Sequence, residues 1–572
     1  MSANTQVSKV LYQIGEVLII KDDKFRSKAF NTASQRISGL TEDIRKIYDR
    51  GELQTIQGVG KGIAAVIAEL LDTGDSTVLN ELEASIPPGI RAMMALEGIG
   101  PKKAVLLQKA LGTLSIEDLE KAAKGGKVQV IKGFGKKTEA NILEAIDVLR
   151  SHQGRFLLGA VVPLIEEIKA YLLESNAVLA VEVAGSARRR RETVGDLDIL
   201  VSSLMPNAVS ERFISMSPVT RVVSHGSTRS TVFMEDSLQV DLRVVHPRSY
   251  GAALQYFTGS KDHNIKLRNI AVRAGYKLNE YGLFYRETDE VVMGDNEKGI
   301  YRALEMDWIP PELRENRGEI EAAVRDTLPN LVTMDDIKGD FHIHSTWSDG
   351  AANIEAMAEK ALSLGLEFMA ICDHTKSLSI ANGLNEDQLR EQMKQIDRIN
   401  EDLDGFTILK GTECDILPDG RMDLPNSLLR DLDFVVGSVH SAFRQDADTM
   451  TKRILKAIHN ENVDCIGHPT GRLIQKRRSY DVNLGRVFEA AAEQGVMMEV
   501  NSYPERLDLN DVNCKAAKEQ GVKMVIGTDS HSPSQMEFMS FGVSVARRGW
   551  LEKENVANSY SLEELEPLLS GN

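Results

Sequence analysis

Apolar and polar residues follow three patterns along the chain. The first third carries apolar residues at helical spacing between short glycine turns, as in the Ala-rich stretch 63–71. The middle holds apolar runs of strand length, beginning with 178–183. From residue 338, apolar strand runs alternate with amphipathic helical stretches such as 385–403 and 449–460. The pattern predicts a multidomain protein that is helical first, α+β in the middle and α/β at the end.

The last part contains seven strand-and-helix units, which predict a parallel α/β barrel. Its predicted strands end in FHIHS, EFMAICDH, FTILKGTEC, DFVVGSVH, VDCIGHP, VMMEVNS and VKMVIGTDSH. Six of the seven end in potential metal ligands, and an acid follows the first strand. Together these residues are His342, His344, Asp349, His374, Glu413, His440, His468, Asp529 and His531. Because strand ends of such barrels meet at one mouth, we expect two or three bound ions there, with Glu413 bridging.

Such a cluster would lower the pKa of a bound water and bind phosphate, as phosphodiester hydrolysis requires. Imidazole and carboxylate accept Zn²⁺ and Mn²⁺ alike, so both metals stay open. Arg472 in HPTGR is a candidate phosphate contact, and a structural ion pair is its alternative. His459 lies on a predicted helix away from any strand end, and we expect no ligand role for it.

The middle part contains VLAVEVAGSARRRRETVGDLDILV, which predicts two strands around a Gly-Ser turn and four arginines. Strand alternation puts Asp196 and Asp198 on one face. Carboxylates this close repel unless a divalent cation lies between them, which indicates a two-metal phosphoryl-transfer site. Asp241, in the alternating run QVDLR, is the expected third acid on a neighbouring strand. The alternative is a solvated strand edge, but the turn and the arginines suit a triphosphate.

A Gly-x-Gly turn with a lysine recurs three times in the first third, each time before a helical stretch. Glycines let main-chain N–H groups approach an anion at a helix N-terminus, and the lysine adds charge. One such turn is usually a tight helix connection, but three favour sequence-independent binding of the DNA backbone. The turn residues are Gly58, Gly60, Lys61, Gly98, Gly100, Lys102, Gly133, Gly135 and Lys136.

These motifs resemble known families. The glycine turns are similar to helix-hairpin-helix motifs, and the Gly-Ser turn, GDLD, Asp241 and YFTGS at 256–260 resemble family X DNA polymerases, the group of DNA polymerase beta. HIHSTWSDG, GTECDI, SVHS, GHPTGR and GTDSH resemble the PHP (polymerase and histidinol phosphatase) domain. This order resembles bacterial family X polymerases. It implies a helical DNA-binding domain at 1–86, helix-hairpin-helix fingers at 87–150, a nucleotidyltransferase palm at 151–247, a thumb at 248–316, a linker at 317–337 and a distorted (βα)7 PHP barrel at 338–572.

The resemblance also implies residue roles. Asp196, Asp198 and Asp241 would be catalytic and bind two Mg²⁺ or Mn²⁺ ions, while the barrel would bind two or three Zn²⁺ or Mn²⁺ ions. The implied partition is His342, His344, Glu413 and Asp529 for one ion, Asp349, His374 and His531 for a second, and Glu413, His440 and His468 for a third. The implied substrate contacts are Gly185, Ser186, Arg189, Tyr256, Phe257, Gly259, Asn264 and Arg268.

As a function, the resemblance implies gap filling with dNTPs on gapped or primed double-stranded DNA in base-excision repair. It adds a 3′-5′ exonuclease and abasic-site cleavage in the barrel, in a monomer of the bacterial cytoplasm. Polymerase beta forms a Schiff base with abasic sugar through a lysine, and Val66 stands at that position here, so we expect no such lyase. Two alternatives stay open: a DNA-structure binding protein with a vestigial palm, and a hydrolase of small phosphomonoesters.

Charge first argues against a nucleic-acid partner, because the 572 residues carry a net charge of -16. Residues 1–330 have a net charge of only -1, whereas residues 331–572 carry -15 and seven of the 11 histidines. DNA affinity is therefore expected mainly in residues 1–330. The four cysteines are widely spaced, which fits a reducing cytoplasm, and no apolar run is long enough to span a membrane.

Overall fold

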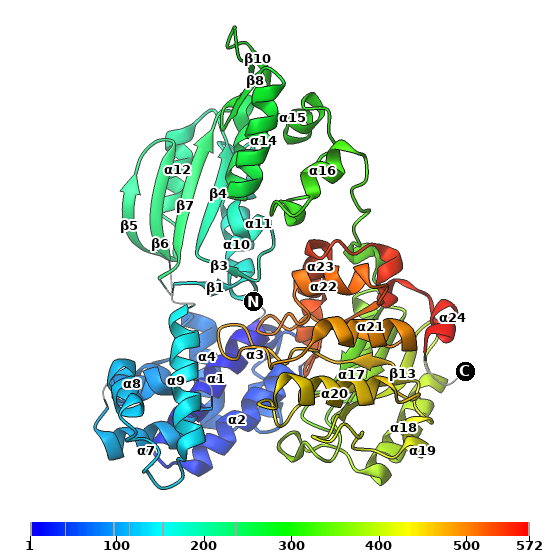
Figure 1. Cartoon of the computed structure of the whole chain (residues 1–572). Coiled ribbons are helices and arrows are strands. Elements are labelled where there is room, and N and C mark those ends of the chain that lie inside the picture. The colour runs from blue at the N-terminus through cyan, green and yellow to red at the C-terminus, as the bar shows by residue number, and fades with distance from the viewer. Residues whose placement is uncertain are drawn as a thin grey trace.

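The protein is described from a computed structural model, which covers residues 3–569 except 41, 95, 97, 114, 152, 153, 235 and 236. Figure 1 shows the N-terminal helices beside the C-terminal barrel, with the sheet of the middle part above them. Within the covered ranges, no helix combines the length and the apolar character that a membrane span requires.

The first part of the chain is helical. Its apolar faces form two buried clusters, one around Leu11, Ile14 and Ile67 and the other around Met93 and Leu107. Aspartates and serines accept backbone hydrogen bonds at several helix starts, as the end of a helix requires. The helices are α1 (Ala3–Ile20), α2 (Lys24–Ser38), α3 (Ile44–Asp49), α4 (Lys61–Thr73), α5 (Thr77–Ala84), α6 (Pro88–Met94), α7 (Pro101–Leu111), α8 (Ile116–Lys124) and α9 (Lys136–Ser151).

The palm region is built on a five-stranded sheet in the order β2-β4-β7-β6-β5. Its strands pair antiparallel except β4 and β7, which run parallel. Helices α10 and α12 bury apolar side chains such as Ile168 and Phe213 in the core beneath the sheet. The elements are β1 (Phe156–Leu157), α10 (Leu158–Leu173), β2 (Ala180–Val183), α11 (Gly185–Arg188), β3 (Thr193–Val194), β4 (Asp196–Ser202), α12 (Pro206–Ile214), β5 (Val219–His225), β6 (Arg229–Met234) and β7 (Gln239–Val245).

The thumb region has its own apolar core, to which Leu267 and Tyr301 belong. Residues after 316 join this core, because Ile320 and Ala323 are buried in it. The buried Glu319 accepts a hydrogen bond of 2.7 Å from His263, so the connector is packed against the thumb. The elements are α13 (Tyr250–Thr258), α14 (Lys261–Arg273), β8 (Tyr276–Asn279), β9 (Gly282–Tyr285), β10 (Val291–Met293), α15 (Glu297–Ala303), the 3-10 turn η4 (Pro311–Leu313) and α16 (Glu319–Val324).

The barrel contains all seven predicted strands, parallel and in sequential order from β11 to β17. A parallel bridge between Ile343 and Ser530 joins the first strand to the last. The predicted helical stretches 385–403 and 449–460 are confirmed as α18 and α20. The strands are β11 (Gly339–Ile343), β12 (Phe368–Ile371), β13 (Thr407–Asp415), β14 (Phe434–Ser438), β15 (Cys465–Ile466), β16 (Met497–Asn501) and β17 (Met524–Gly527). The helices are α17 (Ile354–Ser363), α18 (Glu386–Glu401), α19 (Asn426–Leu429), α20 (Ala447–Ile458), α21 (Leu484–Gln494), α22 (Asp511–Glu519), α23 (Met539–Arg548) and α24 (Leu562–Leu565).

The barrel packs against both other parts. A Cβ atom added at Gly159 of α10 would lie 2.5 Å from Pro504, so only glycine allows this close approach of palm and barrel. One buried apolar cluster accordingly continues from α10 to α23. On the other side, Arg444 of the barrel forms an ion pair of 2.8 Å with Glu144 of α9.

Candidate active sites in the palm and the barrel

The three palm carboxylates come from adjacent parallel strands. Asp198 of β4 and Asp241 of β7 are directly paired in register, and Asp196 precedes Asp198 by one alternation. Between the two acids of β4, Leu197 points into the core and is fully buried. The sheet therefore brings the predicted acids side by side. Three carboxylates so arranged could hold divalent cations.

Burial, followed by the charges of Asp196 and Asp241, raises the pKa of Asp198 to about 6. Asp241 is held by the Gln239 amide at 2.7 Å and by the hydroxyl of Thr231. Mutual repulsion of this kind is relieved by a bound cation, so the donor set fits a metal site.

The Gly-Ser turn lies against these acids. Gly185 has a φ of 59°, and a Cβ atom there would come within 2.7 Å of the Asp198 carboxylate. Ser186 follows in the short helix α11. Arg189 is only 13% exposed, and its guanidinium contacts Glu315 at 3.0 Å and the carbonyl oxygen of Thr258 at 2.5 Å. Arg189, which is predicted to bind the triphosphate, therefore already has two partners within the protein.

The YFTGS segment ends α13 beside the same turn. The ring of Phe257 lies under the guanidinium of Arg243, at 4.3 Å, and meets the ring of Tyr256 edge-on. Gly259 has a φ of 68°, and a Cβ atom there would lie 3.2 Å from the Arg189 side chain.

The two predicted contacts on α14 differ in exposure. The Asn264 amide is buried, accepts a hydrogen bond from Gln255 and donates one of 2.7 Å to the Tyr256 carbonyl. Its side chain therefore holds the end of α13 in this structure. Arg268 is exposed one helical turn further along.

The three glycine turns share one geometry. Their first glycines, Gly58, Gly98 and Gly133, have φ values of 89°, 75° and 92°. Such values favour glycine. The residue inside each turn is apolar and buried, whereas the glycines themselves and the lysines are exposed at the starts of α4, α7 and α9. The exposed turn residues are Gly58, Gly60, Lys61, Gly98, Gly100, Lys102, Gly133, Gly135 and Lys136.

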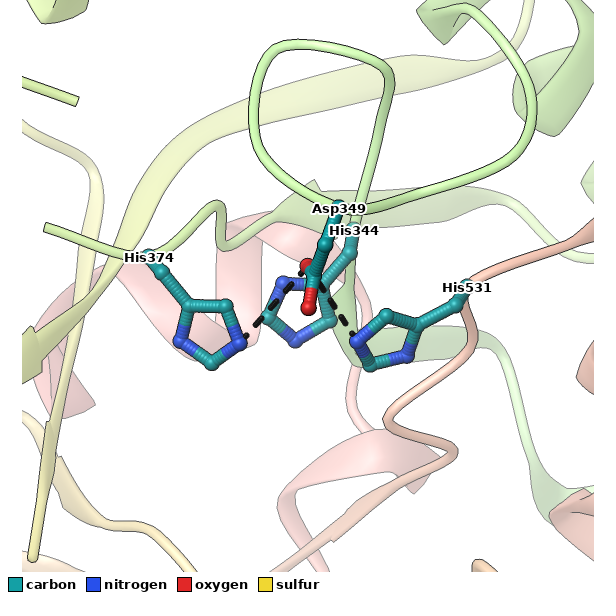
Figure 2. Close-up of side chains that lie close together, drawn as sticks. All are labelled: His344, Asp349, His374 and His531. Carbon is teal, nitrogen blue, oxygen red and sulfur yellow. Dashed lines mark ion pairs between the residues drawn. The ribbon is translucent and has the colours of Figure 1, made fainter. Parts of the chain in front are cut away.

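All nine predicted barrel ligands gather at one end of the strands. Figure 2 shows four of them, His344, Asp349, His374 and His531, with Asp349 between two imidazole rings. The Asp349 carboxylate lies 3.4 Å from His531 and 3.7 Å from His374. Three groups have ligand atoms close enough for one ion each: His344, Asp349, His374 and His531; His342, His344 and Asp529; and His374, Glu413 and His440.

Glu413 stands at the centre of this cluster. Its carboxylate lies within 4.0 Å of five histidine rings, the closest being His374 and His468 at 2.8 Å and His440 at 3.3 Å. Glu413 is fully buried in this position. Glu413 belongs to one of the three groups, with His374 and His440, so its role as a bridge between ions stays a prediction.

Two carboxylates behind the histidines were missed by the sequence analysis. Glu499 of β16 accepts a hydrogen bond of 2.6 Å from His342, and Asp415 of β13 lies 3.0 Å from Nδ1 of His440. Both contacts hold Nδ1 and leave Nε2 facing the cluster, which is how metal-binding histidines are oriented. A signal existed, because the one predicted strand without a ligand at its end carries Glu499 within it.

Nδ1 of His344 and Nδ1 of His468 are buried with no hydrogen bond among the described residues, whereas Nε2 of His342, Nε2 of His344 and Nδ1 of His374 face carboxylate oxygens of Glu413 or Asp529 at 2.8 to 3.6 Å. Ring nitrogens and carboxylate oxygens that face one another in a buried cluster are the donor atoms that a cation between them would bind. Burial, followed by the charges of His531 and His374, lowers the pKa of His344 to about 3, which keeps the ring neutral. Neutral imidazole is the form that binds metal ions, so His344 is already in the form that a metal site needs.

Arginines near the barrel site have separate roles. Arg472 forms an ion pair of 2.7 Å with Glu192 of the palm and also donates to the Leu507 carbonyl. The structure thus has the ion pair that the sequence left as the alternative to a phosphate contact. Arg506 lies 3.6 Å from Asp529. His459 caps the C-terminus of α20, where Nδ1 of its ring lies 2.6 Å from the carbonyl oxygen of Leu455.

The fold and the two sites together define a nucleotidyltransferase of the polymerase type joined to a metal-dependent hydrolase barrel. Family models agree. Residues 253–315 match the DNA polymerase beta thumb, 340–503 the PHP domain, 2–76 a helix-hairpin-helix domain and 90–147 a SAM-like helix-hairpin-helix tandem.

The chain is 39% identical over 553 residues to the DNA polymerase/3′-5′ exonuclease PolX of Bacillus subtilis (strain 168), which covers 96% of both proteins. The chain therefore belongs to the family X DNA polymerases that carry a PHP domain. It is also 30% identical over 231 residues to a probable phosphatase of Thermoanaerobacter sp. (strain X514), which covers 38% of this chain and 89% of that protein. A probable phosphatase of Caldanaerobacter subterraneus subsp. tengcongensis is 32% identical over 203 residues, covering 34% of this chain and 75% of the relative.

Proposed function

We propose that this protein fills short gaps in DNA as a family X polymerase and shortens 3′ ends as a 3′-5′ exonuclease, in base-excision repair. The observation that carries the proposal is the similarity to the Bacillus subtilis polymerase and exonuclease along 96% of both chains. Both acidic clusters are complete in this chain, which argues against a vestigial palm. The substrates are dNTPs and gapped or primed double-stranded DNA, and the protein acts as a monomer.

In the palm, Asp196, Asp198 and Asp241 would hold two Mg²⁺ or Mn²⁺ ions. When bound, the ions neutralise the triphosphate and make the primer 3′-hydroxyl easier to deprotonate. Asp241, on β7 between β4 and β6, would help to orient that hydroxyl. Gly185, Ser186 and Arg189 would bind the triphosphate.

The other nucleotide contacts follow from the end of α13 and from α14. Tyr256, Phe257 and Gly259 would contact the sugar of the incoming nucleotide. Asn264 and Arg268 would lie near the base pair and the template.

In the barrel, the nine ligands would hold two or three Zn²⁺ or Mn²⁺ ions, with Glu413 as the bridge. When bound, the ions supply a hydroxide near neutral pH and bind the scissile phosphate. The chain itself orients the imidazoles through Glu499 and Asp415 and excludes water from their far side. The glycine turns of the helical part would hold the DNA backbone without reading sequence.

A second activity is favoured by the relatives named probable phosphatases, which cover 38% and 34% of this chain. We propose that the barrel also accepts terminal phosphomonoesters and cleaves DNA at abasic sites. p-Nitrophenyl phosphate tests the monoester activity, and an oligonucleotide with one abasic site tests the cleavage. Activity lost in His344→Ala supports the barrel as the common site.

A time course on a 5′-phosphorylated one-nucleotide gap, with and without dNTP, tests the main proposal. Extension by one nucleotide is expected with dNTP, and shortening of the 3′ end is expected without it. Asp196→Ala should abolish extension and spare shortening, whereas His344→Ala should do the reverse. Extension that survives Asp196→Ala would overturn the palm assignment.

A further inference from the structure

The polymerase and barrel parts meet in a buried network of charges that begins at Arg189. One oxygen of Glu315, Oε1, lies 3.0 Å from Nε of Arg189, 3.1 Å from Nη1 of Arg548 and 3.9 Å from Nη1 of Arg191. Arg548 is the last residue of α23 in the barrel, and it also donates a hydrogen bond of 2.6 Å to the carbonyl oxygen of Arg189. A single carboxylate oxygen at the end of the thumb is thus shared by guanidinium groups from two domains.

The far side of Arg548 is also paired. Its Nη2 atom lies 2.7 Å from Asp511 of α22, which accepts a further ion pair of 3.0 Å from Arg317. The side chains of Arg548, Glu315 and Asp511 are 4%, 11% and 15% exposed. At such low exposure, water screens these ion pairs only weakly. Removal of one charged side chain therefore changes how strongly its neighbours in the network attract each other.

Nε of Arg189 is held by Glu315 and Nη1 by the carbonyl oxygen of Thr258, so Arg189 has to release Glu315 before its whole guanidinium fork can bind a triphosphate. Without Arg548, that move would take the closest cation from a mostly buried carboxylate, which is strongly unfavourable. Arg548 contacts the same oxygen and stays behind, so Glu315 keeps a partner. Because Arg548 and Arg189 contact the same oxygen, their like charges also repel each other, which weakens the net hold of the network on Arg189.

We propose that Arg548 of the barrel is a positioning residue of the polymerase site: it keeps Glu315 paired and thereby frees Arg189 for the triphosphate of the incoming nucleotide. The barrel then sets the nucleotide affinity of the other half of the molecule. This inference rests on the proposed nucleotidyl transfer and on the triphosphate role of Arg189.

Steady-state extension by full-length Arg548→Ala tests the proposal, with dTTP as the varied substrate on a primed template and Mg²⁺ present. KM for dTTP is expected to rise on the order of tenfold, with kcat and 3′ shortening close to the wild type. Arg547→Ala is the matched control. Arg547 also joins the barrel to the thumb, through a 2.8 Å ion pair with Glu312, but its ion pair is with neither Glu315 nor Asp511. Its loss should leave KM unchanged.

The double variant Arg548→Ala/Glu315→Gln separates positioning from simple support of the interface. Glutamine removes the charge that would hold Arg189, so KM should return toward the wild-type value. Arg548→Lys keeps the charge but loses the fork that bridges Glu315 and Asp511, and we expect an intermediate KM. Thermal melting shows whether Arg548→Ala folds. If it does not, Arg548→Lys and the single variant Glu315→Gln test the proposal instead, and Glu315→Gln is expected to lower the KM for dTTP.

Equal effects of Arg548→Ala and Arg547→Ala would overturn the proposal, as would a failure of Glu315→Gln to restore KM. A parallel loss of kcat and of 3′ shortening would instead show general loosening of the molecule, and it too would overturn the proposal. An unchanged KM in Arg189→Ala would remove the triphosphate role and this inference while leaving the polymerase function in place. A wild-type protein that extends no primer would refute the proposed function itself.

Discussion

At the level of single residues, the two sites hold their acids differently. In the barrel, carboxylates and imidazoles alternate, so each charge has a partner. In the palm, the neighbours of Asp198 are two further carboxylates, those of Asp196 and Asp241. The barrel should therefore depend on the groups that orient its histidines, and the palm on the protonation of its acids.

Glu499→Gln tests the orientation of His342. Glutamine keeps the size of the side chain but removes the negative charge that holds Nδ1 of His342, so metal affinity should fall about 10- to 100-fold. The measurement is the Mn²⁺ concentration that half-restores 3′ shortening after chelation, with primer extension unchanged. Glu505→Gln is the control, because that carboxylate pairs with Lys476. Equal metal affinity in wild type and Glu499→Gln would remove the orienting role.

The raised pKa of Asp198, about 6, predicts a pH dependence of metal binding in the palm. Below that pH a proton occupies the carboxylate and competes with the cation, whereas above it the carboxylate is free. The Mg²⁺ concentration for half-maximal extension should rise about tenfold per pH unit below the pKa and stay level above it. A titration of Mg²⁺ at several pH values checks this, and a flat dependence through the pKa would contradict it.

At the level of elements, the three hairpins repeat one solution for presenting backbone N–H groups. Each has a first glycine at positive φ and an exposed lysine beside the helix start. In the helix after the first hairpin, a valine stands at the position where polymerase beta has its Schiff-base lysine. This valine, Val66, is 5% exposed and packs in the apolar core of the helical part.

Borohydride treatment of the protein with an abasic-site oligonucleotide should therefore trap no covalent adduct. A Schiff base needs an amine, and valine has none. The readout is a shifted band on a denaturing gel. Lys61 is exposed at the start of the same helix, so Lys61→Ala is the control. An efficient adduct in the wild type would refute the prediction, and its disappearance in Lys61→Ala would identify Lys61 as the nucleophile.

At the level of the whole molecule, buried ion pairs join the domains. Glu297 at the start of the thumb's α15 accepts hydrogen bonds of 2.8 Å from Arg188 of the palm and 2.7 Å from Arg314. Burial opposes the charge of Glu297, yet the two guanidinium groups hold the pKa of its carboxyl well below the usual range. Glu297 thus links the palm to the thumb, as Glu315 does through Arg189.

Glu297→Gln should destabilise the palm and thumb by about 3 kcal/mol at neutral pH, because it leaves buried guanidinium groups without a charged partner. Since the folded-state pKa is depressed, the wild-type contribution is complete above an unfolded-state pKa of about 4.3 and is lost as the pH falls below it. The difference between wild type and variant should therefore shrink in acid. Urea unfolding at neutral and acidic pH measures this, with the exposed Glu287→Gln as the control. A difference that is constant with pH would contradict the prediction.

Much of the architecture was predictable because the decisive signals are local. In a parallel barrel the chain topology forces the strand ends to one edge, so residues at those ends, such as His344, Glu413 and Asp529, meet wherever the helices lie. The same holds for Asp198 and Asp241, which the pairing of two neighbouring strands brings together. Glycine turns are likewise recognisable, since positive φ is a property of single residues.

The sequence by itself thus determined the elements, the two clusters of acids and histidines, and the division of charge between the halves. Only the tertiary structure decided which charges pair across domains: Arg472 with Glu192, and Arg548 with Glu315 and, 359 positions away, the Arg189 carbonyl. Local patterns encode strands and turns through backbone sterics and burial of apolar side chains. Partners from distant segments depend on how finished domains dock, and an arginine in the sequence carries no mark of the carboxylate it will meet.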